Sequence, residues 1–498
     1  MDVEFLRYQY ENRHDGVITK TRFKIGIRHL QVIYMAACSA AMGAVRGSIG
    51  IAVMAVNDVS RRNDTNIQIH NWDYRMHGTV LSSFFFGYAA LLVPADLILE
   101  KINGKAITTT ILAVNGALCL TMPNIVNRGG WIATCNALFM MGMTQACLNT
   151  ANQSLLKNWM PPNESYLCSS FVYGGLQVGV IISIYVAGIL SEARLGWELI
   201  FYSLAMTTLS MAVICAALTA SSPTDHPAVG DEEKEYIREA QSLYRKRPIT
   251  VPWRTVLRTR QFWGVTCAHA ASSAIFVFYL VDVPVYLTSL NISINDSAFY
   301  VLLAVIAMWI LHAMTSPTID WLTNFANVSN LFNATHLRKL INAIGAFVAV
   351  SGLTVLPNLI GARTDVAVIV LTATLASVGF QYSGFLKSLQ DMSENFPGSL
   401  LLMTSSIAGL VGALTPIAVG FILTDDVNSL TRWRIVFILL ASIYALGNIA
   451  YTILGSGERQ VWDEIRTKRK CGYHNMSNQL ELEELNRMTE TQENNDKS

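Results

Sequence analysis

Residues Leu30 to Ala55 read LQVIYMAACSAAMGAVRGSIGIAVMA, and this stretch decides the fold class. A helix of this length crosses the hydrocarbon core of a bilayer. Its single charge, Arg46, lies slightly beyond the middle, where a charge costs about 2.5–3.5 kcal/mol on insertion scales, so we expect it to face protein or water. Small residues recur beside it at helical spacing: Ser39, Gly43, Gly47 and Gly50. The stretch leaves two alternatives for Arg46. The arginine either binds an anion in a water-filled path, or it has a structural role and pairs with helix ends or with a buried carboxylate.

The composition of the whole chain extends this interpretation. The 498 residues are 52% hydrophobic and 14% charged, whereas a soluble domain carries about 25% charge. The apolar residues fall into about a dozen blocks of membrane-spanning length, which predicts an all-α membrane protein with twelve transmembrane helices in a lipid bilayer. The sequence shows no nucleotide-binding loop, metal-ligand cluster or catalytic triad, so we expect no enzyme activity, cofactor or nucleic-acid partner.

Positive charges are distributed unevenly between the two sides of the predicted membrane. With the N-terminus placed inside, 26 of the 36 lysines and arginines fall in inner segments and 8 in outer loops. The positive-inside rule therefore predicts both termini in the cytoplasm. Three sequons then face outward as candidate glycosylation sites: Asn63, Asn291 and Asn295.

The chain divides into two halves of six spans. A long charged inner segment, 220–260, separates a first bundle at 29–219 from a second at 261–455, with cytoplasmic ends at 1–28 and 456–498. The halves echo each other where the fifth span joins the sixth, with VAGIL and GWELIFY in the first and AVGFIL and RWRIVFI in the second. Parallel six-helix repeats predict a transporter whose site lies near the midplane between two bundles. We expect a monomer.

Motifs along most of the chain resemble those of one transporter family. They include RGSIGIAVMAVN, NWDYRMHGTVLSSFFFGY, NWMPPNES, GWELIFY, SSPTDHPAVGDEEKEYI and SGERQVW. On these stretches the chain resembles the major facilitator superfamily and, within it, the anion-cation symporter family of sodium-phosphate cotransporters, sialin and vesicular glutamate transporters. The resemblance implies the major facilitator fold, a small anionic substrate, sodium or proton as coupling ion, and a plasma, endolysosomal or vesicle membrane.

The charged site residues of that family are only partly present. Arg46 matches the arginine of the family's first span. The family's histidine in span two aligns with Leu81, its arginine in span four with Leu138, its acid in span four with Gln145 and its arginine in span seven with Ser272. The resemblance therefore leaves Arg46 as the expected principal anion ligand.

Polar side chains on neighbouring spans complete the candidate binding site. A stripe in span four (Gln145, Asn149, Asn152 and Gln153) either lines the cavity or bonds other helices, and we favour cavity lining for the first two. Span five presents Tyr173 and Gln177 on one face, and span seven presents Ser272 and Phe276 on one face. The candidate substrate-binding residues are Arg46, Gln145, Asn149, Tyr173, Gln177, Ser272 and Phe276.

Other titratable residues are candidates for coupling and gating. His269 can exchange protons near neutral pH, and a neutral packing histidine is the alternative. We expect Asp282 to be an interfacial or gating carboxylate, and Lys387 either snorkels to the inner interface, pairs with Asp391 or contacts the anion. The candidate inner gates are Glu100, Lys101, Lys105 and Asp320.

Together these observations predict a secondary active transporter of inorganic phosphate or a small organic anion that works by alternating access. The alternative is a non-transporting membrane sensor or scaffold that retains the transporter fold. The absence of several family charges favours that alternative.

Overall fold

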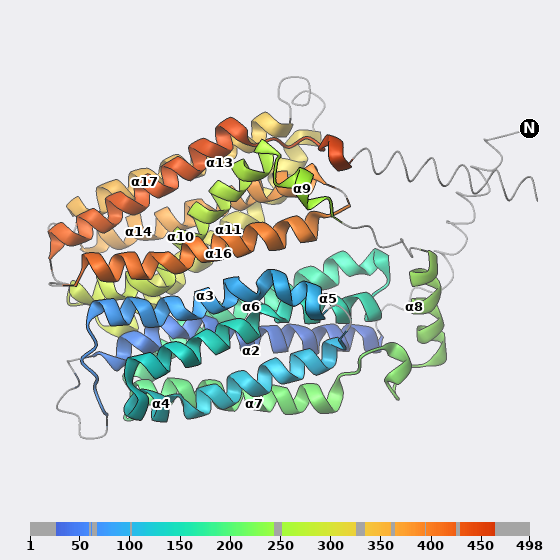
Figure 1. Cartoon of the computed structure of the whole chain (residues 1–498), viewed down its shortest axis with the longest axis horizontal. Coiled ribbons are helices and arrows are strands. Elements are labelled where there is room, and N and C mark those ends of the chain that lie inside the picture. Colours follow the sequence, from blue (N-terminus) through green and yellow to red (C-terminus); the bar gives the residue numbers. More distant parts are fainter. Residues whose placement is uncertain are drawn as a thin grey trace, which may run out of the picture.

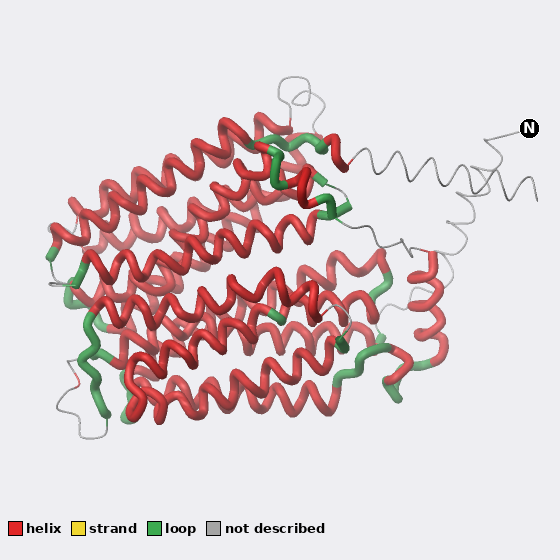
Figure 2. The backbone as a smooth tube through the Cα atoms, in the orientation of Figure 1, coloured by secondary structure: helices red, strands yellow, loops and turns green. Residues whose placement is uncertain are grey.

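The structure is a computed structural model that describes residues 26–58, 61, 67–99, 102–243, 251–324, 334–359, 364–393, 395–424 and 429–463. Within these ranges the secondary structure is helical, without strands (Figure 2). Eleven of the helical runs found there are long and apolar enough to cross a membrane. One of them, Gly104–Trp159, has 56 residues, about 84 Å at helical rise. Its backbone leaves the helical conformation at Gly130 (φ 65°, ψ −164°), so this run makes two crossings and the described chain makes the predicted twelve.

The crossings form two bundles that lie side by side (Figure 1). The first bundle contains α2 (Ile27–Val56), α3 (Tyr74–Leu99), α4 (Gly104–Ala146), α5 (Leu148–Trp159), α6 (Pro162–Ser191) and α7 (Trp197–Leu218). The connecting segment carries η2 (Pro223–Asp225), α8 (Asp231–Leu243) and α9 (Trp253–Val256). The second bundle contains α10 (Arg260–Ser289), α11 (Ile294–Asn324), α13 (Ala334–Leu359), α14 (Thr364–Gln381), the π-helical turn η3 (Tyr382–Leu386), α15 (Lys387–Met392), α16 (Pro397–Ile422) and α17 (Leu430–Leu454).

The two bundles diverge towards the end of the molecule that carries α8 and α9, which we call the α8 end (Figure 1). At the opposite end, which we call the far end, the bundles touch. A Cβ atom added to Gly188 of α6 would lie 2.7 Å from the Cβ atom of Ala298 of α11, and Arg75 of α3 donates a hydrogen bond to Thr424 beyond α16 at 2.8 Å. By the predicted topology the α8 end is cytoplasmic, so this arrangement is closed to the outside.

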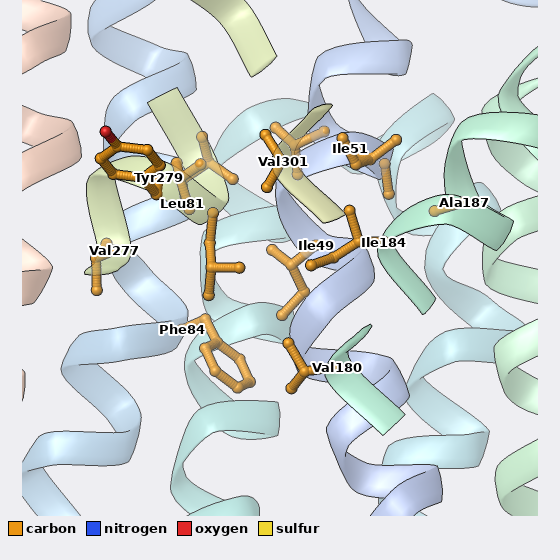
Figure 3. Close-up of a cluster of buried hydrophobic side chains, with 14 of the residues drawn as sticks. Ile49, Ile51, Leu81, Phe84, Val180, Ile184, Ala187, Val277, Tyr279 and Val301 are labelled. Atoms are coloured by element: carbon orange, nitrogen blue, oxygen red, sulfur yellow. The ribbon is translucent and has the colours of Figure 1, made fainter. Parts of the chain in front are cut away.

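One apolar core extends across both bundles near this contact. Figure 3 shows Ile49 and Leu81 of the first bundle beside Tyr279 and Val301 of the second. All four side chains are at most 2% exposed. Contact between the bundles is therefore stabilised by packing, which a conformational change must disrupt.

The connecting segment is anchored to the first bundle through the start of α2. Arg28, 0% exposed, makes a two-pronged ion pair with Glu164 of α6, with N–O distances of 2.8 and 3.1 Å. Glu233 of α8 accepts hydrogen bonds from the backbone N–H groups of Ile27 and Arg28, both at 3.2 Å, where a helix N-terminus favours negative charge. The predicted partly helical linker therefore docks as α8 onto α2 and α6.

Candidate functional site

Arg46 is held near the middle of α2 by the close packing of α2 on α6. A Cβ atom on Gly43 or Gly47 would overlap the backbone of α6 at Leu176 or Val180, so only glycine permits this approach. Arg46 lies ten residues before the far end of α2, about 15 Å along the helix. This depth is close to the midplane of a bilayer whose core is about 30 Å thick.

The guanidinium group of Arg46 contacts aromatic rings and has no anionic partner in the described part of the chain. Its central carbon lies 4.3 Å from the ring centroid of Tyr88 and 6.0 Å from that of Phe84, both on α3. Its Nε atom is buried and makes no hydrogen bond with any described residue. Cation–π contacts orient a guanidinium but leave its net charge in place. The site therefore presents an uncompensated positive charge at midmembrane depth.

The other predicted residues of the first bundle lie in different environments. Gln145 is 1% exposed, and its amide nitrogen is 3.4 Å from Asn115 Oδ1. Asn149, Tyr173 and Gln177 are half-buried, so their side chains are partly accessible. The stripe in span four thus combines a buried glutamine with an accessible asparagine.

Another residue of the polar stripe forms a hydrogen bond with a different helix. Asn152 of α5 is 1% exposed and donates a hydrogen bond to Ser39 Oγ of α2 at 3.0 Å. Of the two alternatives for this polar stripe, interhelical hydrogen bonding applies to Asn152.

Ser272 lies in a polar network inside the second bundle. Its side chain is 0% exposed, and it donates a hydrogen bond to Gln381 Oε1 at 2.9 Å. Gln381 donates to Asn448 Oδ1 at 2.7 Å, and Asn342 donates to the same oxygen at 2.9 Å. This network joins α10, α13, α14 and α17 and encloses the Ser272 hydroxyl, whereas Phe276 on α10 remains half-buried.

An aromatic cluster of the second bundle was not predicted from the sequence. It forms around the π-helical turn η3, a conformation common at functional sites. The ring of Tyr382 stacks on Trp309 with centroids 6.5 Å apart and planes 11° apart, and it also meets His312 at 5.5 Å. The buried Nε1 of Trp309 and Nδ1 of His312 have no partner among the described residues. The spacing of Trp309 and His312 by one helical turn was the available sequence signal.

His269 extends this aromatic cluster onto α10. Its Nδ1 lies 3.2 Å from Thr404 Oγ1 of α16, and its ring centroid lies 5.5 Å from that of Phe385. The imidazole is thus oriented by a hydroxyl and a neighbouring ring. This geometry is compatible with both interpretations of His269, coupling or packing.

The predicted gates are described only in part. Lys105 lies in the first turn of α4, where Asn103 caps the helix by accepting a hydrogen bond from Lys105 N at 3.0 Å. Glu100 and Lys101 lie outside the described residues, as does the side chain of Asp320.

Two of the three predicted glycosylation sites are described, and both lie at the far end. Asn291 is exposed just beyond α10 with a positive φ of 62°. Asn295 lies in the first turn of α11, where its Oδ1 atom is buried. Asn63 lies outside the described residues.

The positions at which the resembled family carries charges are apolar core positions in this chain. Leu81 of α3 and Leu138 of α4 are both 0% exposed within the central hydrophobic cluster. A cation at either position would require a buried partner. These two positions therefore supply no second arginine or histidine that could bind an anion together with Arg46.

Comparisons with known proteins identify the family of this chain. A family model described as Major Facilitator Superfamily matches residues 35–413. A putative inorganic phosphate cotransporter of Drosophila ananassae is 29% identical over 400 residues, which cover 79% of this chain and 81% of that protein. Sialin of Homo sapiens is 27% identical over 395 residues, covering 79% and 78%. Vesicular glutamate transporter 1 of Xenopus laevis is 23% identical over 476 residues, covering 93% and 81%.

Solved structures share the fold at low sequence identity. A D-xylose-proton symporter superimposes with a TM-score of 0.65 at 12% identity, covering 86% of this chain and 99% of that one. A bacterial homologue of the human lysosomal transporter Spinster, inward-facing and unoccupied, superimposes with a TM-score of 0.63 at 13% identity, covering 86% and 96%. These likenesses concern the arrangement of helices alone.

Proposed function

Because this chain belongs to the major facilitator superfamily, and is therefore a multi-pass membrane transporter and not an enzyme, we propose that it carries a small anion by alternating access. The proposed substrate is inorganic phosphate or an organic anion. The relatives of this chain include a putative inorganic phosphate cotransporter and sialin, and their names support this class of substrate.

The observation that carries the proposal is the uncompensated charge of Arg46. Arg46 is half-buried and its Nε atom is buried, and a structural arginine at this depth would be expected to have a carboxylate or free carbonyl groups as partners. No described residue supplies them, and the rings of Tyr88 and Phe84 only fix the orientation of the guanidinium. An incoming anion would supply the missing partner and accept two parallel hydrogen bonds from the planar guanidinium.

The remaining groups proposed to shape the site are accessible polar and aromatic side chains. Asn149, Tyr173 and Gln177 on the first bundle are half-buried, as are His269 and Phe276 on the second. We leave Ser272 out because its hydroxyl is buried in the network with Gln381. Coupling to sodium or protons is part of the proposal, with His269 as the sequence-based candidate.

Divergence of the bundles at the α8 end supports alternating access. In the proposed cycle, a binding site at midmembrane depth would be reached from the α8 end, where the bundles diverge (Figure 1), while the contacts at the far end close the other side. The opposite state requires these far-end contacts to separate.

Uptake into proteoliposomes tests the proposal. The purified full-length chain is reconstituted, and labelled phosphate, glutamate and sialic acid are offered under an imposed sodium gradient, an imposed proton gradient or neither. We expect saturable uptake of at least one anion that exceeds uptake into protein-free vesicles. Absence of uptake of all anions, with correctly folded protein, would favour the sensor or scaffold function.

A further inference from the structure

Asp282 is a buried carboxylic acid in a membrane span that the proposed anion site does not use. It lies on α10, seven residues before the far end of that helix, about 10 Å along the axis. The residue is 4% exposed, and its Oδ2 atom has no hydrogen-bond partner in the described part of the chain. The sequence indicated an interfacial or gating carboxylate, whereas the structure places this group inside the protein.

A second unpartnered oxygen lies one helical turn away on the same side of α10. The hydroxyl of Tyr286 is also buried without a partner among the described residues. Its ring packs at 4.9 Å from the rings of both Trp433 and Phe437. These rings contact Tyr286, one helical turn from Asp282, and they offer no compensation for a negative charge.

The charged and titratable groups of the neighbouring helices do not pair with Asp282. Among the described residues none forms a hydrogen bond or ion pair with it. The helix α16 carries no titratable residue. Those on the other helices packed against α10 are Arg28, His29, Tyr34, Cys38 and Arg46 on α2, Asp296, Tyr300, His312 and Asp320 on α11, Asp365 on α14, Tyr382 on η3, Lys387 and Asp391 on α15, and Arg432, Arg434, Tyr444 and Tyr451 on α17; α10 itself adds Arg260, Cys267, His269, Tyr279 and Tyr286.

An isolated carboxylate without hydrogen bonds is far more costly to bury than the neutral acid. A carboxylate that reaches water instead ionises above about pH 4.

The same helical turn forms part of the contact that closes the far end. A Cβ atom on Gly50 of α2 would overlap the backbone carbonyl oxygen of Leu280, two residues before Asp282. Pro284, two residues after it, removes the N–H group that would otherwise bond that carbonyl and so weakens the helix here. Separation of α2 from α10 hence loosens and hydrates the turn that carries the acid.

We propose that Asp282 is a proton-binding site that controls the far-end gate. A proton from the compartment at the far end converts the carboxylate to the acid, which allows the turn to pack against Trp433 and Phe437 and the gate to close. Deprotonation has the opposite effect and stabilises the open far end. The proton enters and leaves on the far side, since the closed arrangement buries the group. The proton site itself does not depend on the proposed transport function; only its physiological purpose does.

The test measures opening of the far end against pH without any substrate. Thr288, between α10 and α2, lies 3.9 Å from Met54 Sδ in the closed arrangement. A Thr288→Cys variant, with the native cysteines replaced, is purified in detergent at full length, and its maleimide labelling rate is divided by that of an exposed Ser293→Cys variant. This ratio removes the pH dependence of thiol chemistry. Exchange of one proton predicts a ratio that rises up to tenfold per pH unit above about pH 4.

Substitutions at Asp282 test whether this residue causes the pH dependence of the labelling ratio. Asp282→Asn mimics the neutral acid and should give a low ratio at every pH, whereas Asp282→Glu should keep the slope. The matched control, Asp365→Asn at an exposed carboxylate, should also keep it. A flat ratio in the unsubstituted background, or the same slope in Asp282→Asn, would overturn the proposal. If Asp282→Asn fails to fold, the slope of the unsubstituted protein and its retention in Asp282→Glu still decide.

These outcomes are independent of those of the uptake assay. A pH-dependent gate in a protein that transports no anion would refute the proposed function and leave the proton site intact. Anion uptake by a protein whose far-end gate is independent of pH would refute the proton site and leave the proposed function intact.

Discussion

Replacement of Gly188 by alanine should push the far-end contact apart. The new Cβ atom would lie 2.7 Å from the Cβ atom of Ala298 and 3.3 Å from the Cα atom of Asn295. Carbon atoms in contact prefer about 3.5–4.0 Å, so α6 and α11 must separate by about 1 Å. Neither obstructing atom belongs to a flexible side-chain end. Overpacking of this kind costs about 1–3 kcal/mol, and only the closed arrangement bears this cost.

The population of the open far end should therefore rise about 5- to 150-fold. Maleimide labelling of Thr288→Cys at fixed pH measures this population. Gly174→Ala is the matched control, because it is the same substitution on the same helix with no atom within 4 Å of the new Cβ. Equal labelling of the Gly188→Ala and Gly174→Ala variants would refute the reasoning that this contact closes the far end.

Three further predictions concern stability, the site and topology. Arg28→Ala leaves the buried Glu233 without its ion pair and should cost about 3–5 kcal/mol, seen as a lower melting temperature in detergent, whereas Lys234→Ala removes an exposed pair and should change stability by at most about 1 kcal/mol. Tyr88→Ala removes a cation–π contact worth about 0.5–2 kcal/mol and should raise the KM for the anion about 2- to 30-fold, while Tyr88→Phe keeps the ring and should change it little. Glycosidase-sensitive mobility shifts should disappear when the three outer sequons are replaced: Asn63, Asn291 and Asn295. Asn333 begins a further sequon, in a segment that the predicted topology places inside, so a remaining shift that is lost only when Asn333 is replaced would contradict the topology.

The crossings were predictable because bilayer thickness imposes a length on each apolar run. The predicted twelve spans required two crossings within Gly104–Trp159, and the structure places the break between them at Gly130. The helical spacing also grouped the small residues of α2 on one face with Arg46; in the structure Gly43 and Gly47 pack on α6, whereas Gly50 packs on α10. Both features depend on local sequence and on the period of the helix.

The partners of each side chain were not predictable, since they depend on the relative depth and rotation of two helices. Arg46 was identified as the central cation, but its contact with Tyr88 requires the register between α2 and α3. Ser272 occupies a suitable face of its own helix, and yet the rotation of α10 against α14 directs it to Gln381. Asp282 was expected to be an interfacial or gating carboxylate, and its position along α10 alone does not reveal what surrounds it.

The central claim is that Arg46 is the principal anion ligand, and uptake by substituted proteins tests it most directly. Labelled anion uptake is measured for Arg46→Ala, Arg46→Lys and Arg194→Ala, the last of which changes an exposed arginine between α6 and α7. We expect Arg46→Ala to lose saturable uptake at normal membrane expression, and Arg46→Lys to retain little, because an ammonium lacks the planar guanidinium fork. Arg194→Ala should transport normally. Unchanged saturable uptake by Arg46→Ala would contradict the account.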